Sequence, residues 1–299
     1  LEGLPRIDGR YVLISVGKAA CAMVEEAIAN LPKDAPFEAI AVTNYENERA
    51  VAGCRVMASG HPVPDENGAK AAQAVIDLLE TTAKDDVVLA LISGGGSALL
   101  PAPVDGVTLA DKAEVSRILL GAGVEINEMN AIRQQLSRLK GGGMARLAAP
   151  AALRSYILSD VIGDDLRAIA SGPTVAPITT RAGAIALLRT HGIFDAMPAS
   201  VKTHLLSDAS DFEPVETQNT LIGSNRHSIE AMRHASKDGI LISDALVGDV
   251  SDAARLILDA AISNPSKTLL FGGETTVVLT GDGRGGRNQE LALRVAVLA

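Results

Sequence analysis

The chain has 299 residues, of which 47% are hydrophobic, 21% charged and 2% aromatic, and its formal net charge is −9. The negative charge disfavours a nucleic-acid partner, and no window is long and apolar enough to cross a bilayer. Cys21 and Cys54, the only cysteines, lack metal-ligand spacing and exclude a disulfide scaffold. We therefore expect a soluble, cytoplasmic protein with no nucleic-acid or membrane partner and a core of small aliphatic residues.

Short apolar strands alternate with helices along the chain. Strands are predicted within residues 10–18, 37–44, 54–60 and 86–92, helices over 19–31 and in the second half of 60–82, and the pattern recurs at 155–165 and 220–235. Strands that are apolar on both faces and separated by helices predict an α/β fold with a doubly wound, mostly parallel sheet. The pattern restarts after Lys237, so we place a larger domain over 1–235 and a smaller one over 236–299.

Two of these strands end in residues that suit an anion. The strand at 87–92 runs into Ser-Gly-Gly-Gly-Ser at 93–97, where three glycines remove every Cβ and allow a phosphate or carboxylate to approach the backbone N–H groups. A flexible connection explains these glycines equally well. Lys18 lies between a strand and a helix among small neighbours, which favours an anion ligand over a chance surface lysine.

Residues 127–148 combine an apolar stripe with a polar one. At helical spacing, Met129, Ile132, Leu136 and Leu139 form the apolar stripe, and Asn130, Arg133, Ser137 and Lys140 form the polar one. Gly141 to Gly143 can end this helix. Two cations near a glycine run suit an anion, although the pattern alone favours a solvated face.

Acidic and glycine-rich stretches follow later in the chain. Asp160 comes at a predicted strand end, where a carboxylate can act as a general base or hold magnesium, while Asp164 and Asp165 can cap the next turn. Gly281, Gly283 and Gly286 match a dinucleotide fingerprint, but the acidic residue expected roughly 20 positions on is absent. Arg284 and Arg287 favour a phosphoryl group instead. His61 can contact a substrate or form structural hydrogen bonds.

Taken together, these segments resemble the type II glycerate kinase family, whose C-terminal part is the MOFRL domain. The matching stretches are GKAA from Gly17, GHPVPDENG from Gly60, SGGGSALL from Ser93, NAIRQQLSRLKGGGMA from Asn130, LSDVIGDDLRAIASGPT from Leu158 and GGETTVVLTGDGRGGRNQELAL from Gly272. The resemblance implies an ATP- and magnesium-dependent kinase that converts D-glycerate, usually to 2-phosphoglycerate. It also implies a larger and a smaller α/β domain with the active site in the cleft between them.

The resemblance also assigns roles to particular residues. Lys18 and Arg287 would neutralise the transferring phosphoryl group, and Asp160 would orient or deprotonate the glycerate hydroxyl or hold magnesium. Contacts with substrate or phosphate are expected from Ser93, Gly94, Gly95, Gly96, Ser97, Arg133, Lys140, Glu274, Gly283, Gly285, Gly286 and Asn288. Compared with the family, the chain has a short lead before Lys18 and lacks a later Asp-rich segment, so we expect that segment to be needed to complete the cleft.

Two other function classes stay open. An NAD(P)-dependent reductase of hydroxypyruvate or tartronate semialdehyde agrees with the glycine fingerprint but not with the two arginines beside it. A non-catalytic binder of small carboxylates would not need Asp160. The sequence leaves open the oligomeric state and which glycerate hydroxyl is phosphorylated.

Overall fold

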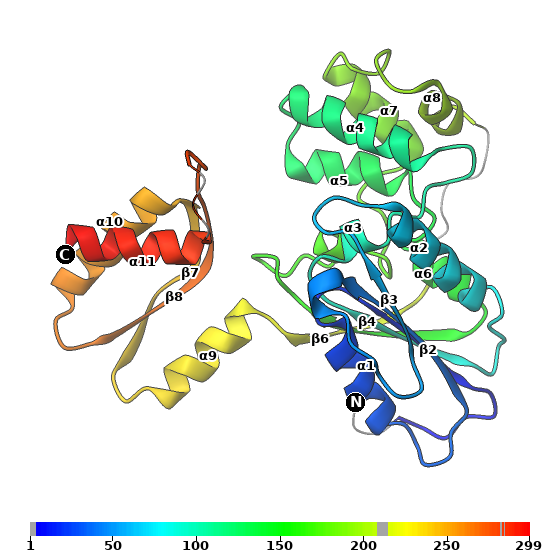
Figure 1. Ribbon diagram of the computed structural model, residues 1–299, viewed down its shortest axis with the longest axis horizontal. Coiled ribbons are helices and arrows are strands. Elements are labelled where there is room, and N and C mark those ends of the chain that lie inside the picture. The colour runs from blue at the N-terminus through cyan, green and yellow to red at the C-terminus, as the bar shows by residue number, and fades with distance from the viewer. Residues whose placement is uncertain (1–3, 208–214, 282, 284) are drawn as a thin grey trace. The chain divides into compact units, whose positions relative to one another are not determined.

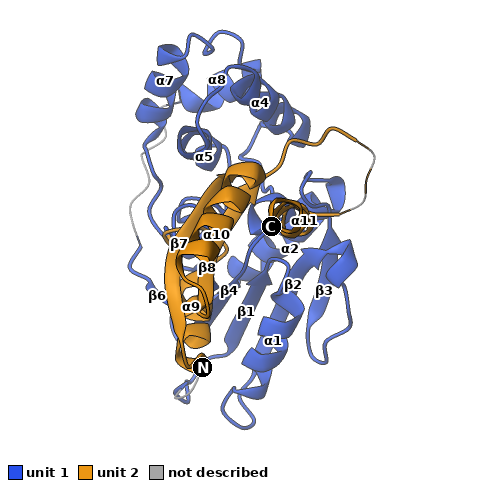
Figure 2. Cartoon of the chain, turned by 90° about the vertical axis from the view of Figure 1, so that its left-hand side faces the viewer, with its two compact units in different colours: residues 1–158, 165–222 blue, residues 159–164, 223–299 orange. Residues whose placement is uncertain are grey.

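The computed structural model of the chain describes residues 4–207, 215–281, 283 and 285–299. The chain forms two compact units, shown in Figure 2. Unit 1 comprises residues 1–158 and 165–222, and unit 2 comprises residues 159–164 and 223–299.

A six-stranded sheet organises unit 1. Its strands are β1 (Tyr11–Val16), β2 (Phe37–Asn44), β3 (Arg55–Ser59), β4 (Val87–Ile92), β5 (Ala152–Leu158) and β6 (Gln218–Gly223). They lie in the order β3-β2-β1-β4-β5-β6, and the pairs β1–β2, β2–β3, β1–β4 and β4–β5 are parallel (Figure 1). The predicted mostly parallel α/β sheet is confirmed. The strand order reverses its direction between β1 and β4, which is where ligands bind in sheets of this kind.

Helices cover the central strands on both faces. On one face, Tyr11 and Leu13 of β1 pack with Val24 of α1 (Ala20–Ala29). The alternate residues Val12 and Ile14 are also buried, and α2 (Glu66–Leu79) contacts β1 and β3. Because β1 and β4 expose neither face, they read as continuous apolar runs in the sequence.

The remaining helices of unit 1 lie between or after β4 and β5. They are α3 (Gly96–Leu99), α4 (Leu109–Gly121), α5 (Ile126–Gln134), α6 (Gly143–Ala148), α7 (Arg181–Thr190) and α8 (Ala199–Leu205), with a 3-10 turn at Ile169–Ser171; another 3-10 turn, Tyr45–Asn47, follows β2. Buried side chains of α4, α5, α7 and α8 form a second core, and the predicted apolar stripe from Met129 to Leu139 is confirmed as buried.

The predicted continuation of this helix to Gly141 is wrong, because α5 ends at Gln134. The backbone beyond it pairs with the segment that follows α3. Val104 N donates to Leu136 O at 3.3 Å, and Arg138 N donates to Ala102 O at 2.9 Å. These long-range bonds replace the hydrogen bonds that a further helical turn would make.

Unit 2 contains a parallel pair of strands, β7 (Gly239–Asp249) and β8 (Thr268–Thr276), with α9 (Asn225–Ala235), α10 (Val250–Ser263) and α11 (Arg287–Leu298). Helix α9 contacts both strands, and its Ile229 is buried against Gly272. This helix therefore groups with unit 2, whereas the sequence ended the larger domain after it, at Ala235. The extents of the folding domains stay a prediction.

No helix in the described parts of the chain combines the length and the hydropathy that crossing a membrane requires.

We predict that Gly272→Ala destabilises the protein. An added Cβ would lie 1.9 Å from Ile229 Cδ1 and 2.5 Å from Asn225 Nδ2, so these side chains or α9 itself must shift. Overpacking of this kind costs about 1–3 kcal/mol, measured as a lower urea midpoint by circular dichroism. Gly281→Ala is the matched control in the same unit, since nothing lies within 4 Å of its added Cβ. Equal midpoints for the two variants would contradict the packing of α9 on β8.

Candidate functional site

The carboxyl ends of β1 and β4 are locked together by backbone contacts. Ser93 N donates to Val16 O at 2.8 Å, and Lys18 N donates to Gly94 O at 2.9 Å. Gly17, with φ 123°, allows this approach, because an added Cβ would lie 2.2 Å from Ser93 Oγ. Lys18 and the glycine loop at 93–97 therefore meet where the strand order reverses.

The Ser93 hydroxyl belongs to this junction. Ser93 is 2% exposed, its Oγ accepts from Ala19 N at 3.1 Å, and it donates to Val16 O at 3.3 Å. Its donor and one of its acceptor sites are thus used within the fold. A direct contact between Ser93 and an anion stays a prediction.

Gly94 and Gly95 form the accessible part of the loop. Both are partly exposed, and no atom of the described residues accepts a hydrogen bond from either N–H. Gly95 has φ 89°, and a Cβ built on it would lie 3.1 Å from His61 Cδ2 and 3.4 Å from Lys18 Cγ. Free N–H groups beside an exposed lysine make a cradle for an oxyanion. Gly96, in contrast, is buried against Ala170.

The structure brings His61 to the same place. Its loop joins β3 to α2 and is held by Asp65, which accepts from Gly68 N at 2.8 Å and from Tyr45 Oη at 2.5 Å. Burial opposes ionisation of Asp65, but these hydrogen bonds outweigh it and lower its pKa. The sequence left His61 open between a substrate contact and a structural role. Its ring now lies beside Gly95 and Lys18, within the same candidate site.

On its other side the glycine loop is anchored by Lys140. Lys140 Nζ donates to Ser97 O at 2.7 Å and to Ser97 Oγ at 2.8 Å, and Ser97 Oγ lies 3.0 Å from Ser171 Oγ. Lys140 is 5% exposed, so the solvated face that the polar stripe suggested is wrong at this position. Arg133, in the same stripe, is partly buried, and burial lowers its pKa.

Ser171 is held in position by a strained backbone segment. The sequence patterns did not identify this residue. Ala170 and Ser171 have φ values of 49° and 61°, a left-handed region that residues with a Cβ rarely adopt. Such strain persists where the surrounding structure enforces it, often at functional sites. Here it packs Ala170 against Gly96 and sets Ser171 beside Ser97.

Asp160 lies in the segment of unit 2 that follows β5. It is exposed, and no described residue forms a hydrogen bond or ion pair with its carboxylate. Its neighbour Ser159 donates from N to Gly223 O at 2.9 Å, which fixes the segment next to the end of β6. Asp165 instead pairs with Arg167 at 2.9 Å and accepts from Arg167 N, the structural role expected of it.

In unit 2, the structure pairs two predicted site residues, Arg287 and Glu274. Arg287 begins α11, and its guanidinium forms an ion pair with Glu274 of β8. A hollow of about 450 Å³ is lined by residues 277–281, Gly283, Gly285, Gly286 and side chains of α11. Asn288 is exposed and is not among the lining residues. Arg284 lies outside the described residues.

The glycines at 281–286 do not have the setting of a dinucleotide fingerprint. Strand β8 ends at Thr276, so Gly281 does not follow it directly, and the sheet there is the two-stranded pair β7–β8. The fingerprint requires its first glycine in the tight turn that leaves the strand of a βαβ unit.

A magnesium site in this protein would need only one carboxylate side chain. Among the described residues, no group of three or more His, Cys, Asp or Glu side chains lies close enough together to hold a metal ion. Magnesium, however, is commonly bound by one or two carboxylates together with substrate phosphates. An exposed, unpaired Asp160 fits that requirement.

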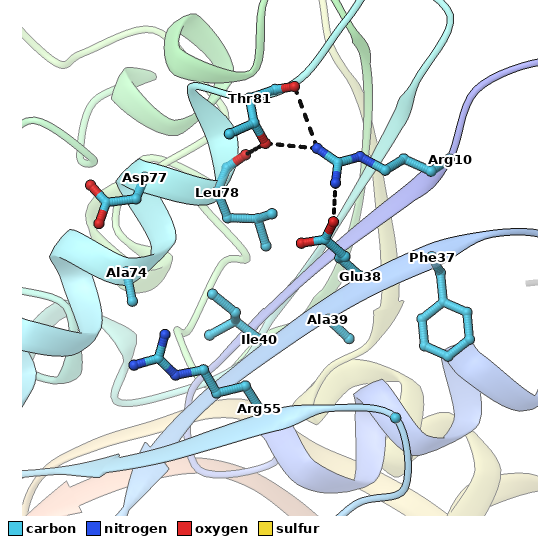
Figure 3. A pocket seen from close by; sticks show the side chains of 11 residues that line it. Arg10, Phe37, Glu38, Ala39, Ile40, Arg55, Ala74, Asp77, Leu78 and Thr81 are labelled. Atoms are coloured by element: carbon cyan, nitrogen blue, oxygen red, sulfur yellow. Dashed lines mark hydrogen bonds and ion pairs between the residues drawn. The ribbon is translucent and has the colours of Figure 1, made fainter.

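A hollow of about 540 Å³ in unit 1 lies at the other ends of the strands (Figure 3). It is lined by Arg10, the first residues of β2 and the last turn of α2. The Arg10 guanidinium pairs with Glu38 and donates to Thr81 Oγ1 at 2.7 Å. Arg10 therefore already has partners within the fold, whereas Arg55, which also lines this hollow, forms no hydrogen bond or ion pair with the described residues.

Comparison with known proteins identifies the family of the chain. Residues 4–206 match the family described as Domain of unknown function (DUF4147), and residues 267–299 match the MOFRL family. The crystal structure of a glycerate kinase from Thermotoga maritima superposes with a TM-score of 0.86, at 35% identity, covering 97% of this chain and 72% of that one. The chain belongs to the type II glycerate kinase family.

Two curated relatives carry different names. Glycerate 2-kinase from Pyrococcus horikoshii is 35% identical over 96% of this chain and 69% of its own length. A protein from Agrobacterium vitis, provisionally named as a hydroxypyruvate reductase, is 39% identical over 99% of this chain and 71% of its own. The kinase resemblance predicted from the sequence motifs is confirmed, and the assigned roles of the individual site residues stay predictions.

We predict that Gly95→Ala weakens oxyanion binding, because its Cβ would crowd Lys18 and His61. The expected result is a several-fold smaller rise in melting temperature with inorganic pyrophosphate. Gly106→Ala is the control, since Gly106 has a similar φ of 79° but nothing within 4 Å of an added Cβ. A pyrophosphate effect that is equal in both variants would remove the loop from the binding site.

Proposed function

We propose that this protein is an ATP- and magnesium-dependent kinase that phosphorylates D-glycerate to 2-phosphoglycerate. The observation that carries the proposal is the exposed Lys18, held by its backbone beside the free N–H groups of Gly94 and Gly95, at the reversal point of the sheet. Relatives named as glycerate kinases over most of this chain support it. A cytoplasmic location is part of the proposal and rests on composition alone.

Phosphoryl transfer needs positioning and charge neutralisation more than covalent chemistry. In the proposed reaction Lys18 and the N–H groups of the loop hold one of the substrate oxyanions. Arg287 offsets negative charge on the phosphoryl group, and Glu274 orients its guanidinium. Gly283, Gly285, Gly286 and Asn288 supply backbone and amide donors for the nucleotide.

Asp160 has two proposed tasks. Its carboxylate accepts the proton of the glycerate hydroxyl, or it binds the magnesium ion that accompanies ATP. Magnesium, when bound, supplies positive charge to the phosphate oxygens. Both tasks need an exposed carboxylate that forms no hydrogen bond or ion pair with the protein. Among the described residues, the Asp160 carboxylate meets this requirement.

The reductase alternative has less support. It has the name of the Agrobacterium vitis relative in its favour. Against it, Gly281 to Gly286 lack the setting of a dinucleotide turn, and the tight turn after β1 reads Gly-Lys-Ala-Ala rather than a glycine fingerprint.

We predict that Lys18→Ala lowers glycerate-dependent ADP release at least 100-fold, because removing a charge that stabilises the transferring group costs several kcal/mol, about 2.7 for each hundredfold. Lys84→Ala, another exposed lysine of unit 1, should leave turnover within twofold. Circular dichroism checks that both variants are folded. Near-normal turnover in Lys18→Ala would remove this residue from the mechanism.

We also predict that D-glycerate raises the melting temperature. A ligand bound only by the native state stabilises it by about 2.7 kcal/mol at a hundred times its Kd. L-Glycerate serves as the control for stereochemical selection. No shift at saturating D-glycerate, with or without nucleotide, would point to another substrate.

A further inference from the structure

Three cations from separate elements gather next to α3 in unit 1. Lys112 comes from α4, Arg133 from α5 and Lys140 from the turn after α5. Lys140 is 5% exposed, and the other two are partly buried. We call these three residues the cation cluster. Lys112 did not stand out in the sequence, because a lysine in an amphipathic helix is usually solvated.

The cluster has more hydrogen-bond donors than protein acceptors. Lys112 Nζ donates to Pro101 O at 2.5 Å, and Lys140 Nζ donates to the carbonyl and hydroxyl oxygens of Ser97. An ammonium has three donors and a guanidinium five. In the described part of the chain, the Arg133 guanidinium donates to no acceptor, and none of the three side chains forms an ion pair with a carboxylate. Donors therefore remain on Lys112 and Arg133.

The charges in the cluster repel one another. Burial, followed by the nearby Arg133 charge, lowers the pKa of Lys112 to about 7. Burial and the charges of Lys112 and Arg133 lower the pKa of Lys140 well below its usual range. No described acidic side chain offsets these effects. Buried charges in proteins are normally paired, since an uncompensated one is costly.

We propose that the cation cluster is a binding site for an oxyanion, either a carboxylate or a phosphate. Such a group would accept hydrogen bonds from the remaining donors of Lys112 and Arg133. Its negative charge would offset the repulsion among the three basic side chains. Lys112 and Arg133 are each partly exposed to solvent, whereas Lys140 is buried. Lys140 joins the site to Ser97, so binding there also braces the glycine loop. Naming D-glycerate and ADP as sources rests on the proposed function, whereas the site itself does not.

The test is the melting temperature of the whole chain at pH 6, where Lys112 is mostly protonated, with inorganic phosphate, D-glycerate or ADP. Lys112→Met removes one charge from the cluster, so the free variant should melt no lower than the wild type. Its anion-induced rise should fall to less than half of the wild-type value. Lys84→Met, an exposed lysine of the same unit, should keep the full rise. The anion whose stabilising effect depends on Lys112 shows whether the group that binds the cluster is a phosphate or a carboxylate.

Lys18→Ala separates this site from the glycine loop, because the Lys112-dependent part of the shift should persist in that background. Should Lys112→Met fail to fold, Arg133→Met replaces it, and Lys112→Arg should retain the shift. An undiminished anion effect in Lys112→Met, or no effect of any of the three anions on the wild type, would overturn the proposal. None of these measurements depends on turnover, so they fail independently of the kinase assignment.

Discussion

The contact between β1 and β4 at their carboxyl ends is the constraint on which the candidate site depends. Two backbone hydrogen bonds, from Ser93 N to Val16 O and from Lys18 N to Gly94 O, bring the strand end and the glycine loop together. They require Gly17, since any Cβ there would overlap Ser93. Lys18 therefore cannot move away from the loop without breaking the sheet at the point where its strand order reverses, the place where α/β sheets bind ligands.

The glycine loop is a braced structure and not a flexible connection. One end is bonded to β1, and the other is held at Ser97 by Lys140 and Ser171. Strained backbone at Ala170 and Ser171 packs against Gly96. The bracing leaves Gly94 and Gly95 accessible, with N–H groups that no described atom accepts. Preorganised donors of this kind stabilise negative charge without having to rearrange, which is what phosphoryl transfer demands.

Local sequence patterns predicted the features that depend on local chemistry. Strand β2 over Phe37–Asn44 was recoverable because it is apolar on both faces, and Lys18 because it stands between a strand and a helix. The end of α5 at Gln134 was not recoverable, since it depends on pairing between Leu136 and Val104, which are distant in sequence. The burial of Lys140 was hidden for a similar reason. A polar stripe reads as solvated until the contact of Lys140 with Ser97 of α3 is known.

The most direct measurement offers the native protein both candidate reactions in parallel. One arm supplies ATP, magnesium and D-glycerate and follows ADP release. The other supplies hydroxypyruvate with NADH or NADPH and follows cofactor absorbance. ADP formation that depends on glycerate, without cofactor oxidation, is the result that the geometry at Lys18 and Gly94 predicts. Cofactor oxidation without ADP would contradict it and would assign the glycine run at 281–286 to a dinucleotide.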